Sequence, residues 1–313
     1  MNHFISDIIR HGDTVKEFRI RRQDGAAMPA WTAGAHLQLT FTLADGSEAE
    51  RHYSLLGQPQ AGGEYRIAVL LDPDGKGGSR HLHAQIQLGD GVTMGGPYNT
   101  FPLAPGAGCA ILIAGGIGVT PLLSMAHELA RSGRAVKFHY IARSEERLVL
   151  LDEIKAIPGA LIFVHLSGQG GRPDLASITG AYAKDAAIYA CGPVGLLQEI
   201  SSTAALQGWP QSSVHVESFG GRNDAADGPL EVHLAQSGLT IQALPVTSLL
   251  DALLEAGAFM SFDCNRGECG SCFTQVLEGT PLHRDVCLTE PQRAIGMCPC
   301  VSWAGGNRLV LDI

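Results

Sequence analysis

The chain has 313 residues, of which 45% are hydrophobic and 17% charged, and its formal net charge is −9. This length accommodates two or three domains of common size, and the acidic balance argues against a nucleic-acid partner. No apolar run reaches the ~18 residues that a membrane span needs, so we expect no membrane partner. Because the first residues lack the features of a signal peptide, a cytoplasmic protein is expected.

Residues 1–105 alternate short strand-like runs with turns, a pattern typical of a small antiparallel β-barrel. The runs cover 18–21, 36–43, 65–71 and 92–94. Further on, the sequence DGKGGSR at 74–80 precedes a helix-like stretch at 81–87. Glycines and a serine before a helix can hold a terminal phosphate on backbone N–H groups.

Residues 109–219 alternate apolar strands with helical patterns, which predicts a parallel α/β sheet. The strand at 110–114 runs into GGIGVTP at 115–121, and a helical pattern over 121–131 follows. Glycines at this point let backbone N–H groups approach a pyrophosphate, which the helix dipole also favours. A tight structural turn is the plainer alternative for this loop.

The sequence CGP at 191–193 ends another apolar strand and precedes another helical pattern. Ligands of open parallel sheets bind at the carboxyl ends of strands, which is where this turn would lie. Cys191 on its own would equally suit a small buried apolar position. The second turn therefore supports a nucleotide site without establishing one.

The polar sequence GGRNDAADGP at 220–229 lacks periodicity and predicts a linker. Beyond it, we expect a hairpin from 230–234 and 239–244, and a helix over 248–256 with Ser248 or Thr247 as N-cap. Six of the eight cysteines lie in this last segment, at 264, 269, 272, 287, 298 and 300. Such clustering points to a metal site.

The sequence CNRGECGSC at 264–272 has the spacing C-x4-C-x2-C. Zinc sites usually use two C-x2-C pairs or add histidine, and disulfides are uncommon in a reducing cytoplasm. This spacing with a distant fourth cysteine is that of plant-type [2Fe–2S] clusters, and the loop glycines let N–H groups point at sulfur. Spacing alone leaves the fourth ligand open, above all between Cys298 and Cys300.

GGIGVTP at 115–121 and CGP at 191–193 resemble the pyridine-nucleotide domain of the ferredoxin-reductase superfamily. The resemblance implies that the first loop holds the NAD(P)H pyrophosphate. It also implies that the second turn lies beside the nicotinamide, where hydride leaves for a flavin. The residues so implied are Gly115, Gly116, Gly118, Thr120, Cys191, Gly192 and Pro193.

A flavin motif is then expected in the barrel, and RHYS at 51–54 resembles the R-x-Y-S of this superfamily. The resemblance implies that Arg51 neutralises the flavin phosphate, that Tyr53 packs near the ring and that Ser54 hydrogen-bonds its N5 edge. His52 stands where threonine is common. The residues implied for a terminal phosphate, which suits FMN better than FAD, are Gly77, Gly78 and Ser79.

P-x-N-x-F at 97–101 and V-x-x-E-x-F at 214–219 narrow the resemblance to the phthalate dioxygenase reductase group, over nearly the whole chain. This group implies an antiparallel FMN-binding β-barrel at 1–105 and an NAD(P)H-binding α/β domain at 106–222. It implies an α+β (β-grasp) plant-type [2Fe–2S] ferredoxin domain at 228–313. Phe219 would shield the flavin until nicotinamide displaces it. The residues expected to take part in hydride transfer are Ser54, Thr120, Cys191 and Phe219.

The resemblance also selects the fourth cysteine, because CVS at 300–302 matches a tripeptide of this group. Cys287 and Cys298 are then left as buried or half-buried thiols. The implied cluster ligands are Cys264, Cys269, Cys272 and Cys300.

A hydride delivers two electrons together and a cluster accepts one, so a flavin must act between them. The expected flow is from NAD(P)H through FMN and the cluster to the oxygenase component of a Rieske-type oxygenase or O-demethylase. A cytochrome P450 or another acceptor, or a redox-sensing role, are alternatives. NADH is favoured by the resemblance, although Arg143 and Ser144 could accept the 2′-phosphate of NADPH. Arg266 and Glu268 are the first expected contacts with an acceptor.

Overall fold

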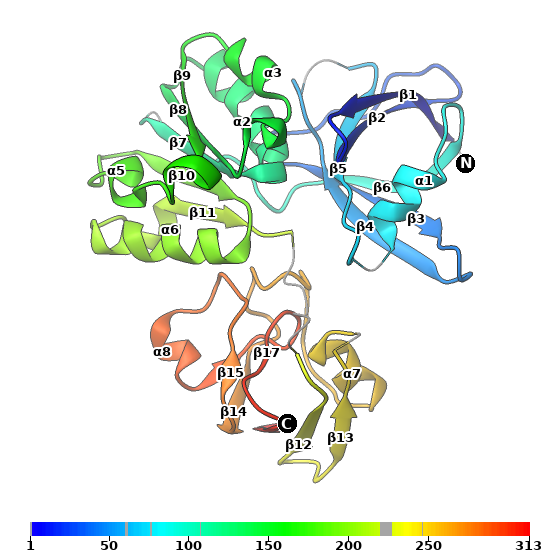
Figure 1. Ribbon diagram of the computed structural model, residues 1–313, viewed down its shortest axis with the longest axis vertical. Coiled ribbons are helices and arrows are strands. Elements are labelled where there is room, and N and C mark those ends of the chain that lie inside the picture. Colours follow the sequence, from blue (N-terminus) through cyan, green and yellow to red (C-terminus); the bar gives the residue numbers. More distant parts are fainter. Residues whose placement is uncertain (1, 60–61, 76, 107, 220–226, 246) are drawn as a thin grey trace. The chain divides into compact units, whose positions relative to one another are not determined.

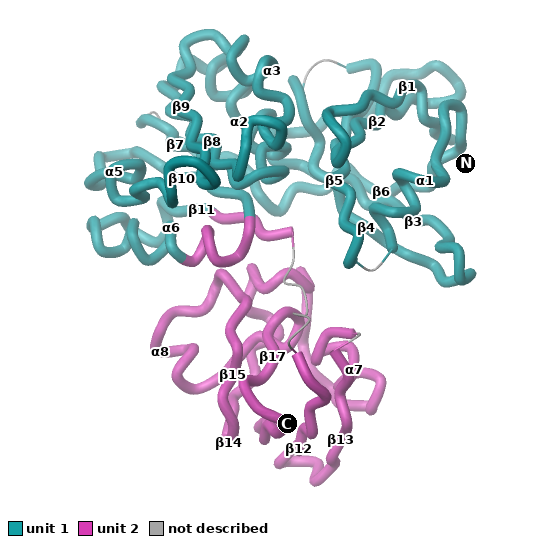
Figure 2. The backbone as a smooth tube through the Cα atoms, viewed as in Figure 1, with its two compact units in different colours: residues 1–192, 199–215 teal, residues 193–198, 216–313 magenta. Residues whose placement is uncertain are grey.

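The computed structural model describes residues 2–59, 62–75, 77–106, 108–219, 227–245 and 247–313. The chain divides into two compact units (Figure 2), the first comprising 1–192 and 199–215 and the second 193–198 and 216–313. Residues 220–226 of the predicted linker lie outside the described part. No helix in the described ranges combines the length and the apolar character that crossing a membrane requires.

A six-stranded antiparallel barrel begins the first unit (Figure 1). Its strand order is β4-β3-β6-β1-β2-β5, and Leu55 bridges Ile67 of β5, which brings the two outer strands together. Inward-facing side chains such as Phe18 and Leu37 fill the interior. The elements are β1 (His3–His11), β2 (Val15–Arg22), β3 (His36–Thr42), β4 (Glu48–Ser54), β5 (Tyr65–Leu70), α1 (Gly78–Ala84) and β6 (Gly91–Tyr98).

Strands β1 and β4 are absent from the sequence prediction, whereas the four predicted runs correspond to β2, β3, β5 and β6. Strand β4 reads EAERHYS, and only Ala49 and Ser54 are buried in it. A strand with so few apolar residues carries little periodic signal, because its pairing partners rather than its composition hold it in the sheet.

A five-stranded sheet with parallel β7, β8, β9 and β10 follows, in the order β11-β10-β7-β8-β9. The strands are β7 (Ala110–Gly115), β8 (Val136–Ala142), β9 (Ala160–Leu166), β10 (Ala187–Cys191) and β11 (Val214–Glu217). The helices are α2 (Val119–Arg131), α3 (Leu151–Lys155), α4 (Ser167–Gly170), α5 (Leu175–Thr179) and α6 (Val194–Leu206). The predicted α/β alternation is confirmed.

The barrel and this sheet share one hydrophobic core within the first unit. Val15, Leu56 and Phe101 from the barrel side belong to the same buried cluster as Leu112 of β7 and Leu122 of α2. Burying these side chains together stabilises both parts at once, since each side chain removes apolar surface from water. The barrel therefore has its own interior cluster and shares a second buried cluster with the sheet.

The second unit contains a mixed sheet in the order β13-β12-β18-β14-β16, in which β12 and β18 are parallel. Ser248 is the N-cap of α7, because its Oγ accepts from the N–H of Asp251 at 3.0 Å. The predicted hairpin is confirmed as β12 and β13. The elements are β12 (Leu230–Leu234), β13 (Thr240–Ala243), α7 (Leu249–Glu255), β14 (Thr274–Glu278), β15 (Pro281–Leu282), α8 (Glu290–Arg293), β16 (Gly296–Met297), β17 (Trp303–Ala304) and β18 (Arg308–Leu311).

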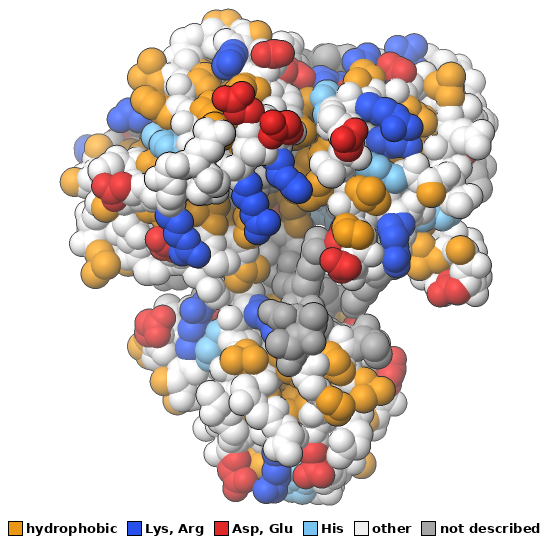
Figure 3. Space-filling view, viewed as in Figure 1, with side chains coloured by type: hydrophobic (Ala, Val, Ile, Leu, Met, Phe, Trp, Pro, Cys, Tyr) orange, Lys and Arg blue, Asp and Glu red, His pale blue; other side chains and the backbone are white. Residues whose placement is uncertain are grey.

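The charged side chains on the face shown in Figure 3 are mixed in sign, with acidic and basic groups interspersed over both units. Described ion pairs such as Arg22–Asp24 and Arg131–Glu128 lie at the surface. Water screens such pairs, so each contributes little to stability.

Candidate functional site

The loop GGIGVTP lies at the carboxyl end of β7 and leads into α2. Gly116 has a φ of 56°, a conformation that glycine adopts without strain, and the loop continues as the 3-10 helix η1 (Gly116–Gly118). Thr120 is buried in the first turn of α2, and its Oγ1 donates to the carbonyl oxygen of Ile117 at 3.0 Å. The start of a 13-residue helix therefore supports the loop, and its dipole favours a bound anion.

The turn CGP at 191–193 packs directly against this loop. Strands β10 and β7 are parallel neighbours, so both end at the same edge of the sheet. A Cβ on Gly118 would lie 2.8 Å from the backbone nitrogen of Gly192, and one on Gly192 would lie 2.9 Å from the Cα of Gly115. Such approaches are sterically forbidden, so both positions require glycine. The structure thus joins the two turns into one surface.

The remaining residues predicted for the nucleotide lie along the same edge. Cys191 ends β10 and is fully buried. Pro193 is exposed, and its carbonyl oxygen accepts the N–H groups of residues 196 and 197 at the start of α6. Arg143 is exposed and Ser144 is half-buried directly after β8. A nucleotide bound at this edge would be within reach of all three strand ends.

Strand β4 carries RHYS, and its alternation separates the four side chains. Arg51 and Tyr53 share one face of the strand, while His52 and Ser54 share the other. Tyr53 packs against the barrel core, and burial raises its pKa well above the usual range despite the opposing charge of Arg51. His52 is exposed and stacks on His36, with ring centroids 5.0 Å apart. Ser54 is buried at the end of the strand.

Helix α1 begins against Arg51. Gly77 precedes the helix with a φ of 84°, and Gly78 is its first residue. A Cβ on Gly78 would lie 2.8 Å from Nε of Arg51, so glycine lets the guanidinium approach the backbone there. Ser79 Oγ accepts the N–H of Asp72 at 3.0 Å, which ties the start of α1 to the chain after β5. A guanidinium beside the backbone at a helix start suits a phosphate group.

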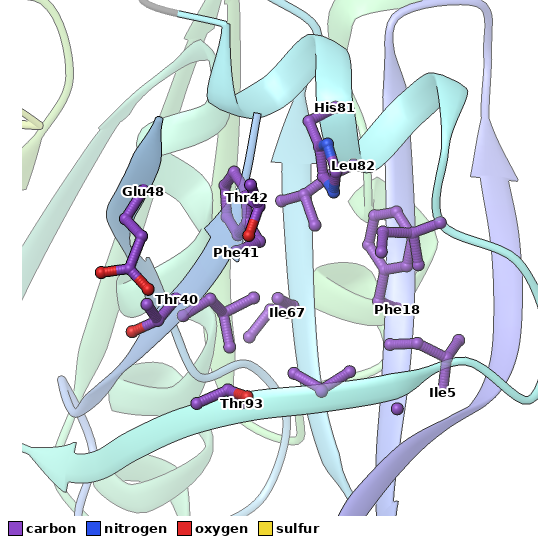
Figure 4. A pocket seen from close by; sticks show the side chains of 14 residues that line it. Ile5, Phe18, Thr40, Phe41, Thr42, Glu48, Ile67, His81, Leu82 and Thr93 are labelled. Atoms are coloured by element: carbon purple, nitrogen blue, oxygen red, sulfur yellow. The ribbon is translucent and has the colours of Figure 1, made fainter. Parts of the chain in front are cut away.

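A cavity of about 350 Å³ also lies within the barrel (Figure 4). Its lining is mostly apolar and includes Phe18, Leu39 and Leu82. The ring of Phe41 stacks on that of His81, with centroids 4.8 Å apart. None of the described residues predicted to bind flavin lines it, so this cavity is a gap in the barrel core and not part of the predicted flavin site.

An ion-pair network that the sequence analysis missed joins the barrel to the α/β sheet within the first unit. Arg66 of β5 donates from Nε to Glu17 at 2.7 Å and from both Nη atoms to Glu153 of α3 at 2.9 Å. Burial by itself would raise the pKa of Glu17, but hydrogen bonds from His11 and Arg66 outweigh it and lower the pKa to about 2. No motif links residues so distant in sequence, so pattern reading had no signal for them.

The cysteine loop lies between α7 and β14. Two backbone N–H groups, those of Arg266 and Glu268, point at Sγ of Cys264, each at 3.4 Å. The N–H of Ser271 points at Sγ of Cys269 at 3.4 Å. Such donors stabilise thiolates and help set a cluster's reduction potential. The expected wrapping of backbone donors around sulfur is confirmed.

The sulfur of Cys300 lies 3.3 Å from that of Cys272. The sulfur of Cys298 lies 3.9 Å from that of Cys287, and Cys298 also hydrogen-bonds to Cys272. Cys272 and Cys300 are buried, whereas Cys269 is exposed. Three thiols on one loop, a fourth beside them and N–H groups aimed at sulfur fit a [2Fe–2S] cluster.

The side chains of Arg266 and Glu268 turn inward and offer little surface to an acceptor, so the contact expected there stays a prediction. They are only 14% and 15% exposed, and Nη2 of Arg266 lies 3.3 Å from Oε2 of Glu268. Nη1 of Arg266 lies 3.8 Å from Oε1 of Glu217, which is 2% exposed. Burial, followed by the charge of Glu268, raises the pKa of Glu217 to about 8, against the effect of Arg266. The polar contacts of Arg266 with the buried Glu217 and with Glu268 account for the inward turn.

Exposed aromatic side chains accompany the cluster loop. Phe259 is 98% exposed and Phe262 is 47% exposed, close in sequence to the first ligand of the loop. Phe219 follows β11, is 46% exposed and belongs to the second unit, so its role beside the flavin stays a prediction. Exposed aromatic groups near an exposed ligand such as Cys269 are candidates for contact with a protein partner.

Two family models match the chain. The model described as an oxidoreductase FAD-binding domain matches residues 5–102. The model described as a 2Fe-2S iron-sulfur cluster binding domain matches residues 232–304. The C-terminal part is therefore a 2Fe–2S domain, and the barrel is a flavin-binding domain.

Relatives and a solved structure match over almost the whole length. The beta subunit of a heme-dependent oxidative N-demethylase from Ectopseudomonas mendocina (strain ymp) is 38% identical, over 92% of this chain and 91% of the relative. A vanillate O-demethylase oxidoreductase from Pseudomonas putida is 37% identical, over 95% of this chain and 94% of the relative. The structure of phthalate dioxygenase reductase, described as modular for electron transfer from pyridine nucleotides to [2Fe–2S], matches with a TM-score of 0.73, 32% identity and coverage of 99% and 97%.

Proposed function

The chain belongs to the phthalate dioxygenase reductase group of iron–sulfur flavoprotein oxidoreductases, and we propose that it passes electrons from NADH to the oxygenase component of a Rieske-type oxygenase or O-demethylase. FMN and the [2Fe–2S] cluster are the carriers in between. The observation that carries this proposal is the contact between the turns at 115–121 and 191–193, in the same compact unit as the flavin barrel. A cytoplasmic location is part of the proposal.

We assign three functional domains, with FMN binding at 1–105, NAD(P)H binding at 106–222 and the ferredoxin domain at 228–313. The first two share one buried cluster besides the barrel's own interior, so this division follows the cofactors rather than separate folding units. The two matched family models support the first and the last assignment.

At the nucleotide site, Gly115, Gly116 and Gly118 present backbone N–H groups to the pyrophosphate, and Thr120 holds the loop against α2 through its bond to residue 117. Cys191 and its turn, which continues through Gly192 and Pro193, face the nicotinamide. Cys191 itself is fully buried at the end of β10. Arg143 and Ser144 lie where a 2′-phosphate would bind, so NADPH remains the second nucleotide of this proposal.

At the flavin site, Arg51 and the helix start at Gly77, Gly78 and Ser79 hold the terminal phosphate of FMN. The approach of Arg51 to Gly78 supports this assignment. A bound flavin accepts a hydride and releases its electrons singly. The side chains that orient the flavin ring are Tyr53 and Ser54. His52 lies at the edge of the ring, and Phe219 shields the ring until nicotinamide displaces it.

At the cluster, the proposed ligands are Cys264, Cys269, Cys272 and Cys300. The sulfur of Cys300 lies 3.3 Å from that of Cys272, which fits a shared metal centre, and the match of residues 300–302 to the tripeptide of this group selects Cys300 over Cys298. Cys269 is the exposed ligand and marks the side from which an electron leaves.

A haem-containing acceptor, such as the catalytic partner of a demethylase or a cytochrome P450, is the second candidate. The name of one relative, a heme-dependent oxidative N-demethylase subunit, favours it. A Rieske centre and a haem both accept single electrons at potentials above that of a plant-type cluster.

Three measurements test the proposal. Chromatography of flavin released by denaturation should yield FMN, and FAD would contradict the phosphate assignment. Anaerobic mixing with NADH should bleach the flavin faster than mixing with NADPH does, and the reverse would assign Arg143 and Ser144 to a 2′-phosphate. Steady NADH-driven reduction of ferricyanide and cytochrome c separates an enzyme from a redox sensor, which would reduce once and stop.

A further inference from the structure

Cys287 and Cys298 form a thiol pair for which the proposed electron path has no use. Their sulfurs are 3.9 Å apart, and both residues lie in irregular segments, Cys287 before α8 and Cys298 directly after β16. A disulfide bond requires the sulfurs to approach to ~2.05 Å, a closure that side-chain rotation and small loop shifts can supply. We propose that this pair is a redox-responsive site that forms a reversible disulfide beside the cluster.

Hydrogen bonds anchor each segment, and the N–H of Arg284 joins the two by donating to Oγ of Ser302 at 3.1 Å. The carbonyl oxygen of Cys298 accepts the N–H groups of Val301 at 3.2 Å and Ser302 at 3.0 Å. On the other side, the N–H of Val286 donates to the carbonyl oxygen of Gly267 in the cysteine loop at 2.9 Å. Because each cysteine is anchored through its neighbours, the short distance between the sulfurs is a property of the fold.

The two thiols differ in access, which assigns each a role. Cys287 is half-buried and reachable from solvent, while Cys298 is buried. Sensor cysteines are typically accessible and adjacent to a second thiol that resolves the first oxidation product. Cys287 is therefore the thiol that the peroxide oxidises first, and Cys298 is the resolving thiol.

The oxidant is a hydroperoxide, hydrogen peroxide in the simplest case. The sulfur of Cys287 attacks the O–O bond, an S–O bond forms, and the second oxygen leaves as water, which gives a sulfenic acid. The sulfur of Cys298 then attacks that of Cys287, the S–S bond forms, and the hydroxyl group leaves as water with the thiol proton. The two thiols lose two electrons, and one peroxide becomes two waters.

The disulfide would connect two segments that adjoin the proposed cluster ligands. Cys287 Sγ lies 3.8 Å from where a Cβ of Gly270 would stand, and Cys298 is separated from Cys300 by Pro299 alone. Its formation would fix these segments around the cluster without using any of the four proposed ligands. The site thus differs from the metal centre that it adjoins.

To test this, the full chain, loaded with flavin and cluster, is titrated with hydrogen peroxide, from less than one to more than one equivalent per protein. Remaining thiols are then alkylated and the tryptic peptides are mapped by mass spectrometry. The peptide 285–293 carries Cys287, and 294–308 carries both Cys298 and Cys300. Fragmentation at the bond before Pro299 distinguishes these last two. Absorbance of the cluster is followed in the same samples.

The expected result is a link between Cys287 and Cys298 that forms before cluster absorbance falls and that a dithiol reductant reverses. Cys298→Ser should leave a sulfenic acid on Cys287 that dimedone labels, and Cys287→Ser should form no link. Cys109 is the internal control, because it is equally half-buried, and Cys109→Ser should leave the link unchanged.

Two results would overturn the proposal. One is loss of the cluster with ligand-to-ligand links, such as Cys272 to Cys300, while Cys287 remains a free thiol. The other is a sulfenic acid on Cys287 that persists in the unsubstituted chain, which would show that Cys298 does not reach it. Both readings come from the unsubstituted protein, so they stand even if a variant fails to fold. Added peroxide makes the outcome independent of the proposed electron acceptor.

Discussion

The loop proposed to bind the nucleotide and the loop proposed to bind the cluster differ in what they offer a ligand. Gly115, Gly116, Gly118 and Gly192 carry no side chain, and backbone packs on backbone so closely that a Cβ on Gly118 or Gly192 would not fit. At 264–272, side chains supply the chemistry, and the backbone turns its N–H groups toward the sulfurs of Cys264 and Cys269. The first site depends on close backbone packing, and the second depends on particular ligand atoms.

This difference determines how each site should fail. A site that depends on close backbone packing is disrupted when a side-chain atom is added, since an extra methyl group displaces backbone that many other contacts hold. A site that depends on ligand atoms is disrupted when one of them is removed, since a metal centre missing one ligand loses its closed coordination. The substitutions below test that distinction in order of expected effect.

The largest effect is expected from removing one sulfur. Cys300→Ser should abolish the cluster and the transfer of single electrons to cytochrome c, while NADH still bleaches the flavin. Cys298→Ser is the matched control and should keep the cluster, because the sulfur of Cys300 and not of Cys298 is the proposed fourth ligand. Electron paramagnetic resonance of the reduced proteins reports cluster content. A cluster that survives Cys300→Ser and disappears in Cys298→Ser would reverse the assignment.

Adding one methyl group at the nucleotide loop should have the next largest effect. Gly118→Ala would place a Cβ against the backbone of residues 191 and 192, so we expect the free energy of unfolding to fall by about 2 kcal/mol or more, with weaker NADH binding. Gly195→Ala in α6 meets no atom within 4 Å and should stabilise the protein by about 0.5–1 kcal/mol. Denaturant unfolding gives the change in stability of each variant, and the KM for NADH gives the change in nucleotide binding. Equal effects of the two substitutions would contradict the steric account.

The ion-pair network of Arg66 should produce a dependence on acid. Hydrogen bonds, including those from Arg66, lower the pKa of Glu17 and of Glu153 to about 2 even though burial opposes this. Carboxyl groups with depressed pKa values stabilise the fold above their unfolded pKa of 4.5 and lose that contribution as the pH falls from 4.5 toward 2. Stability of the first unit should therefore fall steeply over that window.

Arg66→Met should cost about 2–3 kcal/mol at neutral pH, a value discounted from that of fully buried pairs because Arg66 and Glu153 are partly exposed. It should also flatten the acid dependence, as measured by circular dichroism. The matched control is Arg131→Met, which breaks the exposed pair with Glu128 and should change stability by less than about 0.5 kcal/mol. An unchanged acid profile in Arg66→Met would show that the network is not the cause.

The smallest effect is expected at the exposed aromatic residue near the cluster loop. Phe259→Ser removes a side chain that is 98% exposed, so folding should be unaffected. If the acceptor contacts it, KM for the oxygenase component should rise about tenfold, which corresponds to about 1.4 kcal/mol. Rates with ferricyanide should stay the same. Leu206→Ser, 89% exposed in the first unit, is the control, and an equal rise there would mean a nonspecific effect.

The sequence predicted those parts of the molecule whose physical requirement is local. The spacing of the cysteines, the glycine turns after apolar strands and the N-cap at Ser248 are all readable within a few residues. Strand β4 escaped notice because its apolar signal is weak, although its RHYS motif was identified. Its place in the barrel depends on pairing with β3 and on the bridge from Leu55 to Ile67.

Non-local features were out of reach for the same reason. The triad of Glu17, Arg66 and Glu153 draws on three elements that no motif connects. Arg266 and Glu268 turn inward beside the buried Glu217, an arrangement that the loop sequence alone did not predict. Burial of an acid can be recognised only when the fold shows what surrounds it.

The core that the barrel shares with the α/β sheet has a consequence for how such proteins diversify. Val15, Leu56 and Phe101 are buried with Leu112 and Leu122, so a chain cut between the two sequence domains would expose one hydrophobic surface on each piece. The second unit keeps a core of its own, built around side chains such as Leu230 and Trp303. Recombination can therefore exchange the second unit, which carries the proposed cluster ligands, as an intact piece. The proposed flavin and nucleotide sites are then inherited together. Choice of electron acceptor is then free to change without disturbing choice of electron donor.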